Sequence, residues 1–135
     1  MPDKYNFSIT NTTRGKIPPV PFVSIKNVAL GKDYSLSLVF IGEKLSARLN
    51  RSYRGKNKPT NILSFPLDKK TKNRAGKGEI FITFPLVKKE AKLFGRKPEN
   101  FIVFLFIHGL MHLKGMEHGS TMDRAEAKLH RQFCV

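Results

Sequence analysis

Residues 98–115 read PENFIVFLFIHGLMHLKG and contain the longest mostly apolar stretch of the chain, from Phe101 to Leu113. A run of this length exceeds an ordinary strand of about 5 or 6 residues, so we predict a helix over residues 98–114. Proline in the first turn and glycine after the last turn are usual helix boundaries. Because the segment is apolar almost all round, we expect a central, buried helix. It is shorter than the roughly 20 residues that a membrane span needs, so we expect no membrane contact.

The flanking segments carry alternating strand and helix patterns. Alternating or short apolar runs predict strands at residues 5–9, 36–40, 62–65 and 78–83. Helical spacing predicts helices at residues 22–29, 45–53, 85–94 and 120–133. We expect Pro66 to end the third strand and Ser120 to cap the last helix. The order β-α-β-α-β-β-α-α-α predicts an α+β fold, with a small mixed sheet of about four strands covered by helices.

Length and composition predict one folded domain over residues 1–135. Hydrophobic residues make up 40% of the 135 residues, enough for a packed interior, so a collagen, a mucin and a disordered tail are excluded. The single cysteine, Cys134, cannot form a disulfide within the chain. The first residues lack the apolar segment of a secretory signal, so we expect a cytoplasmic protein. The oligomeric state stays open.

The charge is strongly one-sided. The chain carries 25 Lys and Arg against 10 Asp and Glu, a net charge of +15, which favours an anionic partner such as nucleic acid. Residues 44–67 contain six basic side chains and no acidic one. A second basic run lies in a segment with little apolar character, which we expect to be a flexible loop: Lys69, Lys70, Lys72, Arg74 and Lys77. A solvated, soluble surface is the alternative interpretation of both runs.

Three of the four histidines fall within residues 108–118. His108 and His112 are four residues apart on the predicted helix, so both imidazoles can face one point. Gly115 then allows the chain to reverse, and His118 can return as a third ligand. Three imidazoles around one divalent ion leave a fourth position for water, which is typical of a catalytic zinc site. Satisfied core or surface histidines are the alternative, although unpaired imidazoles are costly on so apolar a helix. We predict that His130 lies at the surface.

The histidine spacing is also that of certain metallopeptidases, which carry a glutamate as general base directly after the first histidine. In this chain that position is Gly109. A metallopeptidase-like hydrolase therefore remains an alternative in which the metal ligands are present but the usual general base is absent. Glu79 and Glu117 are candidates for proton transfer, with a surface salt bridge as the more ordinary role for either.

Two blocks resemble the YbeY family of bacterial single-strand-specific endoribonucleases: residues 49–68, LNRSYRGKNKPTNILSFPLD, and residues 108–118, HGLMHLKGMEH. The resemblance implies an α+β fold, one zinc ion per chain on His108, His112 and His118, and a functionally required arginine at Arg54. It also implies maturation of the 3′ end of small-subunit (16S) ribosomal RNA (rRNA) and a part in ribosome quality control.

These expectations combine into one mechanism. A divalent ion lowers the pKa of its bound water to about 7 and supplies the nucleophile, while the Arg54 guanidinium stabilises phosphoryl charge. We expect Lys56, Lys58 and the basic loop to guide single-stranded RNA in this mechanism.

Phe65 and Phe81 lie in strand patterns, so we expect them to be core residues rather than residues that stack on bases. A non-catalytic rRNA-binding assembly factor with structural zinc remains an alternative.

Overall fold

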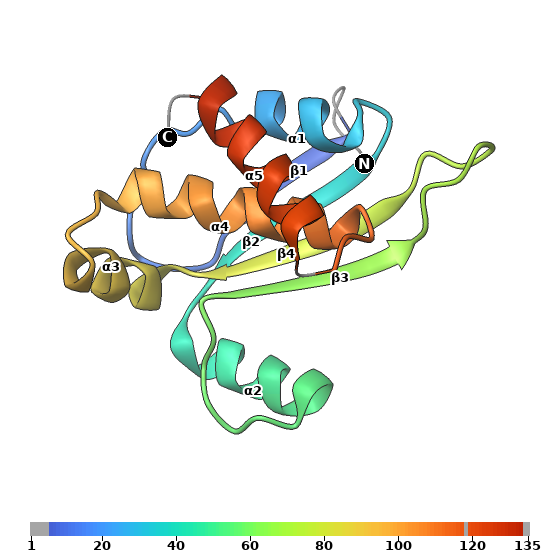
Figure 1. Cartoon of the computed structure of the whole chain (residues 1–135). Helices are drawn as coiled ribbons and strands as arrows, with labels where there is room; N and C mark the ends of the chain where they lie inside the picture. Colours follow the sequence, from blue (N-terminus) through green and yellow to red (C-terminus); the bar gives the residue numbers. More distant parts are fainter. Residues whose placement is uncertain (1–5, 118, 134–135) are drawn as a thin grey trace.

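The computed structural model describes residues 6–117 and 119–133, which form a four-stranded sheet with five helices (Figure 1). The strands are β1 (Phe7–Asn11), β2 (Ser35–Ile41), β3 (Ile62–Asp68) and β4 (Lys77–Thr83). The helices are α1 (Phe22–Leu30), α2 (Glu43–Arg54), α3 (Phe84–Leu93), α4 (Pro98–Leu113) and α5 (Ser120–Gln132). No helix within the described ranges is long and apolar enough to cross a bilayer.

The sheet is mixed, with strand order β1-β2-β4-β3. β1 and β2 are parallel, β2 and β4 are parallel, and β3 runs antiparallel to β4 as the hairpin that projects from the molecule in Figure 1. This arrangement confirms the predicted α+β class and element order. Strand β3 lies at one edge, which matters for function because its side chains face helix α4 at the end of the sheet.

Helix α4 is the centre of the core, as its apolar composition predicts. Ten of its residues are buried, and it contacts α1, α3, α5, β3 and β4. Helices α1, α4 and α5 lie on one side of the sheet, whereas α2 lies on the other (Figure 1). The C-terminal end of α4 therefore meets the edge strand β3 and lies near the start of α5.

Gly109 allows α4 to approach the sheet this closely. A Cβ atom at this position would lie 2.8 Å from the Ser64 hydroxyl oxygen and 2.9 Å from a methyl group of Ile62. Residue 109 thus faces the sheet, whereas the neighbouring His108 is part of a cavity on the helix flank. This packing explains why the position that carries glutamate in the metallopeptidase pattern is glycine here.

We expect Gly109→Glu to lower the free energy of unfolding by at least about 3 kcal/mol, because it forces an unpaired carboxylate into a packed interface. Urea unfolding followed by circular dichroism measures the change. The matched control is Gly42→Glu, where a Cβ meets nothing within 4 Å. The control should change stability by less than about 0.5 kcal/mol, as surface substitutions do. Equal stability of both variants would contradict this packing.

Two local predictions were wrong. Strand β3 continues through Pro66 to Asp68, because an edge strand tolerates a residue without an N–H and the register shifts between Pro66 and Asp68. The connecting loop is correspondingly shorter than predicted. Helix α5 has Gly119 at its N-cap with no side-chain cap, so Ser120 does not have that role.

Candidate active site

Two histidines meet on the flank of α4. The Nε2 atoms of His108 and His112 lie 3.1 Å apart, and the two rings are nearly perpendicular at 86°. The helical spacing of four residues brings them together, as the sequence predicts. His118 lies outside the described residues, so its placement relative to this pair stays a prediction.

The other nitrogen of His108 is held by a carboxylate. Nδ1 of His108 lies 3.0 Å from Oε2 of Glu126 on helix α5, with the two side chains 25% and 13% exposed. An ionised carboxylate only accepts hydrogen bonds, so it holds the proton on Nδ1 and leaves the Nε2 lone pair of His108 facing His112. This carboxylate–imidazole pairing is the one that orients metal-binding histidines in proteins.

We expect Glu126→Gln to weaken zinc binding by about 10- to 100-fold, because the neutral amide no longer stabilises the ring in this tautomer by charge. Competition with a chromogenic chelator measures the affinity. Glu99→Gln on the first turn of α4 is the matched control, because it removes one carboxylate far from the histidines along the same helix. Unchanged zinc affinity in Glu126→Gln would remove the carboxylate from the site.

The histidine pair fits a metal ion. Two nitrogens, each about 2.0–2.1 Å from one tetrahedral zinc ion, are separated by about 3.3 Å, close to the observed separation. Within residues 6–117 and 119–133, no group of three His, Cys, Asp or Glu side chains could hold a metal. His118, which the sequence predicts as the third ligand, lies outside those ranges.

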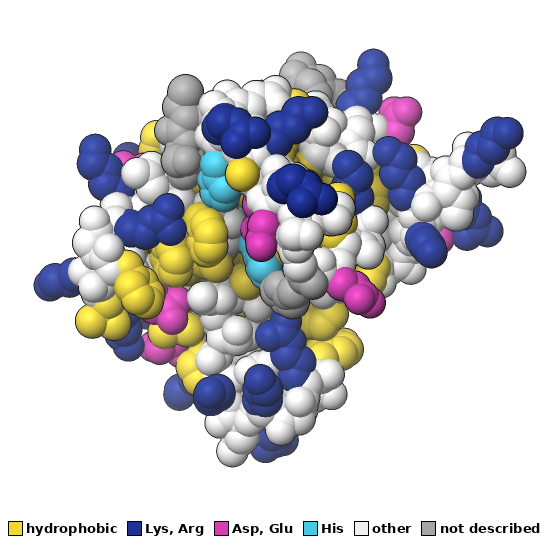
Figure 2. Space-filling view, in the orientation of Figure 1, with side chains coloured by type: hydrophobic (Ala, Val, Ile, Leu, Met, Phe, Trp, Pro, Cys, Tyr) yellow, Lys and Arg dark blue, Asp and Glu magenta, His cyan; other side chains and the backbone are white. Residues whose placement is uncertain are grey.

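Arg54 lies on the wall of the same cavity as the histidines. The cavity has a volume of about 580 Å³ and lies between the end of α2, strand β3 and helix α4. Its polar lining includes Thr60, Asn61 and Ser64 in addition to Arg54, and none of its lining residues within the described ranges is acidic. Figure 2 shows histidine surface near the centre of this face, above helix α2.

Local hydrogen bonds fix the wall that carries Arg54. Ser46 on α2 donates through its hydroxyl to the carbonyl oxygen of Thr60 at 2.9 Å, and Asn50 donates to that of Lys58 at 2.8 Å. Gly55 ends the helix in the left-handed region with φ 69°, a conformation that glycine adopts at no steric cost. The loop after α2 is thereby held against the helix, with Arg54 at their junction.

Comparison with known proteins identifies the relatives of this chain. The family model described as "Endoribonuclease YbeY" matches residues 9–133. The chain belongs to the YbeY family. This family consists of endoribonucleases, which are hydrolases, and the expectation from the two motif blocks is confirmed.

Individual YbeY relatives match at moderate identity. A Halalkalibacterium halodurans protein named Endoribonuclease YbeY is 35% identical over 109 residues, which cover 73% of this chain and 68% of the relative. The Aliarcobacter butzleri protein of the same name is 32% identical over 127 residues, covering 94% of this chain and 88% of the relative. Other matches cover between 57% and 65% of the relatives' own length.

The fold is also that of a solved structure. The solution structure of TM1509 from Thermotoga maritima superposes with a TM-score of 0.64 at 23% identity, covering 94% of this chain and 88% of that one. The α+β architecture is therefore common to both chains.

The predicted RNA-binding lysines do not form one surface. Lys56 and Lys58 line a hollow of about 280 Å³ that also includes Arg54. Lys69 and Lys70 line a different cavity, which also includes His112.

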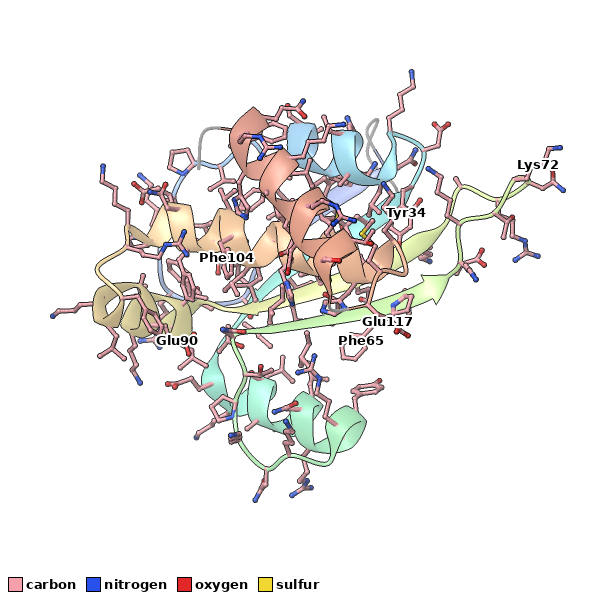
Figure 3. All side chains as sticks on the ribbon, in the orientation of Figure 1. Tyr34, Phe65, Lys72, Glu90, Phe104 and Glu117 are labelled. Carbon is pink, nitrogen blue, oxygen red and sulfur yellow. The ribbon has the colours of Figure 1, made fainter. Side chains whose placement is uncertain are left out.

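The remaining basic side chains of the predicted loop lie away from the histidines. Lys72 is at the far end of the β3–β4 hairpin (Figure 3). Arg74 forms an ion pair with Asp68 at 3.2 Å. Lys77 lies in β4 and lines a hollow with Ser37 and Glu79 that contains neither histidine. RNA contact by these three stays a prediction.

Two other predictions about aromatic and imidazole side chains need correction. Phe65 and Phe81 are half-buried rather than in the core, and Phe65 contacts the exposed ring of Tyr53 with centroids 4.6 Å apart. His130 is half-buried and stacks on Phe104, with centroids 5.8 Å apart, so it is not a surface residue. Burial lowers the pKa of His130, although the Glu126 carboxylate acts in the opposite direction.

Glu126 is a site residue that the sequence does not predict. The sequence makes Glu79 and Glu117 the candidates for proton transfer, yet Glu79 lines the separate hollow with Lys77 and Glu117 is exposed. Glu126 lies 18 residues from His108 along the chain, and only the packing of α5 on α4 brings the two side chains together.

Proposed function

We propose that this protein is a zinc-dependent endoribonuclease of single-stranded RNA in the cytoplasm. Its proposed substrate is small-subunit rRNA, in maturation of the 3′ end and in ribosome quality control. The observation that carries the proposal is the shared cavity of Arg54, His108 and His112. Membership of an endoribonuclease family supports RNA as the substrate, and the ribosomal role rests on the family resemblance.

One zinc ion per chain is proposed to be held by His108, His112 and His118. When bound, such an ion would act as a Lewis acid and lower the pKa of a bound water towards neutrality. The distance between the two Nε2 atoms and the carboxylate behind His108 support this assignment. The protein's own contribution is to fix both rings in one orientation before the substrate arrives.

The cavity lining suits a polyanion. Arg54 stays charged at every relevant pH and can bind a phosphate through two donors, which places positive charge where the phosphoryl oxygens gain negative charge. Thr60 and Ser64 offer hydroxyl groups, and Asn61 donates through its amide to Glu90 at 3.0 Å. The lining residues within the described ranges include no carboxylate that would repel the RNA backbone.

The peptidase alternative lacks its base in this structure. Its general base would occupy position 109, which packs against Ser64 and Ile62 rather than lining the cavity. The high positive charge of the chain is likewise not required for peptide substrates. Both observations favour phosphodiester cleavage over peptide cleavage.

A cleavage assay tests the proposal. The zinc-loaded chain is incubated with a single-stranded RNA that contains the 3′ end of 16S rRNA, with the same sequence as a duplex, and with casein. We expect internal cuts in the single-stranded RNA only. Proteolysis of casein would instead indicate a metallopeptidase. Tight RNA binding without cleavage would indicate a non-catalytic assembly factor, and either result would overturn the proposal.

A chelator separates catalytic from structural zinc. We expect chelation to stop RNA cleavage while the circular dichroism spectrum stays that of a folded protein, because the core packed around α4 consists of apolar side chains rather than metal ligands. Unfolding on chelation would show that the metal stabilises the fold instead.

A further inference from the structure

A second cavity adjoins the active site on the other side of His112. It has a volume of about 460 Å³ and lies between the end of α1, strand β3 with the start of its loop, and the end of α4. Pro66 and His112 line both this cavity and the one that contains Arg54. A ligand in the second cavity is therefore separated from the proposed reaction centre by one imidazole side chain.

We propose that this second cavity is a nucleotide subsite, which holds the nucleoside next to the phosphodiester that is cut. The proposal rests on the proposed function, because it assigns the neighbouring cavity to the scissile phosphate. The volume lies within the range of about 300–1,000 Å³ that small-molecule sites occupy, so one nucleotide fits.

The walls of the second cavity match the two chemical parts of a nucleotide. Leu30, Leu113 and Pro66 supply apolar surface, which suits the faces of a base. Lys69 and Lys114 are exposed cations at the same cavity, which suits a phosphate.

The charge at this cavity remains positive when the other groups are included. The ammonium of Lys70 donates a hydrogen bond to the carbonyl oxygen of Leu30 at 2.9 Å, which fixes a third cation on the wall. Asp68 is the acidic lining residue within the described ranges, and Arg74 neutralises it at 3.2 Å. The balance favours an anionic ligand over a neutral one.

Tyr34 lines the cavity, but its hydroxyl is buried beside Gly78. The residue is 2% exposed, and its hydroxyl forms no hydrogen bond with the described residues. The contacts that we propose for the ligand therefore do not include this hydroxyl.

The three hollows adjoin one another. The hollow with Lys56 and Lys58 shares Arg54, Thr60 and Asn61 with the histidine cavity, which in turn shares Pro66 and His112 with the second cavity. An RNA chain lying across the three hollows would therefore meet cations before and after the histidine cavity. This is the arrangement that an enzyme needs to cut within a chain rather than from its end.

A titration with nucleotides tests the subsite without any cleavage. The four ribonucleoside monophosphates are added to the full zinc-loaded chain, and methyl resonances are followed by nuclear magnetic resonance. We expect saturable shifts at the methyl groups of Ala29, Leu30 and Leu113, and smaller shifts with inorganic phosphate. Absence of shifts at these methyl groups up to millimolar nucleotide would overturn the proposal.

A double variant tests the exposed cations. We expect the double substitution Lys69→Ala and Lys114→Ala to weaken nucleotide binding at least fivefold. The double control Lys92→Ala and Lys128→Ala removes the same charge from exposed sites on α3 and α5, and should bind as the parent does.

The outcomes separate this proposal from the proposed function. Equal losses of nucleotide binding in the test and control doubles, or parent-like binding by the Lys69/Lys114 double, would overturn the subsite. Such a result leaves RNA cleavage intact as a function. Nucleotide binding in this cavity by a chain that does not cleave RNA would support the subsite and reject the endoribonuclease.

Discussion

Replacement of His112 by alanine is expected to lower RNA cleavage by about 10³-fold, because it removes a metal ligand and with it several kcal/mol of transition-state stabilisation. His112 also lines both the proposed catalytic cavity and the neighbouring cavity, so no other imidazole in the described ranges takes its place. Initial rates on single-stranded RNA and the zinc content of the purified variant measure the effect. Both the cleavage rate and the zinc content should fall.

The control for this loss is His130→Ala, which removes an imidazole that stacks on Phe104 rather than facing His108. It should retain one zinc ion per chain. A fully active His112→Ala variant would show that the imidazole pair takes no part in cleavage.

Replacement of Arg54 by alanine is expected to lower cleavage of single-stranded RNA at least about tenfold, near 1.4 kcal/mol, while zinc content stays unchanged. The expected reason is the loss of a positive charge from the cavity that holds the histidines, where the proposed reaction would develop phosphoryl charge. Single-turnover rates at saturating RNA isolate this effect from weaker binding.

Two further variants define what Arg54 contributes. Arg54→Lys keeps the charge and loses the planar pair of donors, so intermediate activity indicates two-donor binding of phosphate. Arg51→Ala removes an exposed arginine from the preceding turn of α2 and should cleave as the parent does. Equal losses in Arg51→Ala and Arg54→Ala would point to general charge rather than to a specific role.

The sequence predicts the central parts of the site because they depend on local spacing. His108 and His112 converge since residues four apart share a helix face, and the apolar run around them makes α4 the core helix. Arg54 and Gly55 lie at the end of a helix whose period is visible in the sequence. These features need no knowledge of how distant elements pack.

Features that depend on tertiary packing could not be predicted in this way. Glu126 reaches His108 only because α5 lies across α4, and nothing in the spacing around Glu126 indicates a partner. Pro66 remains within a strand because β3 lies at the edge of the sheet, a position that strand order alone determines.

The sequence likewise does not predict which side chains of the basic loop share a surface. Lys69 and Lys70 line a cavity that includes His112, whereas Lys77 lines a different hollow. A charge run in sequence therefore indicates an anionic partner without indicating which of its members share a surface.

The zinc K-edge X-ray absorption spectrum of the purified, zinc-loaded chain tests whether His108, His112 and His118 bind one ion. We predict one zinc ion per chain with three imidazole nitrogens at about 2.0–2.1 Å and one oxygen in the fourth position. A chain that binds no zinc, or a spectrum without imidazole ligands, would contradict it.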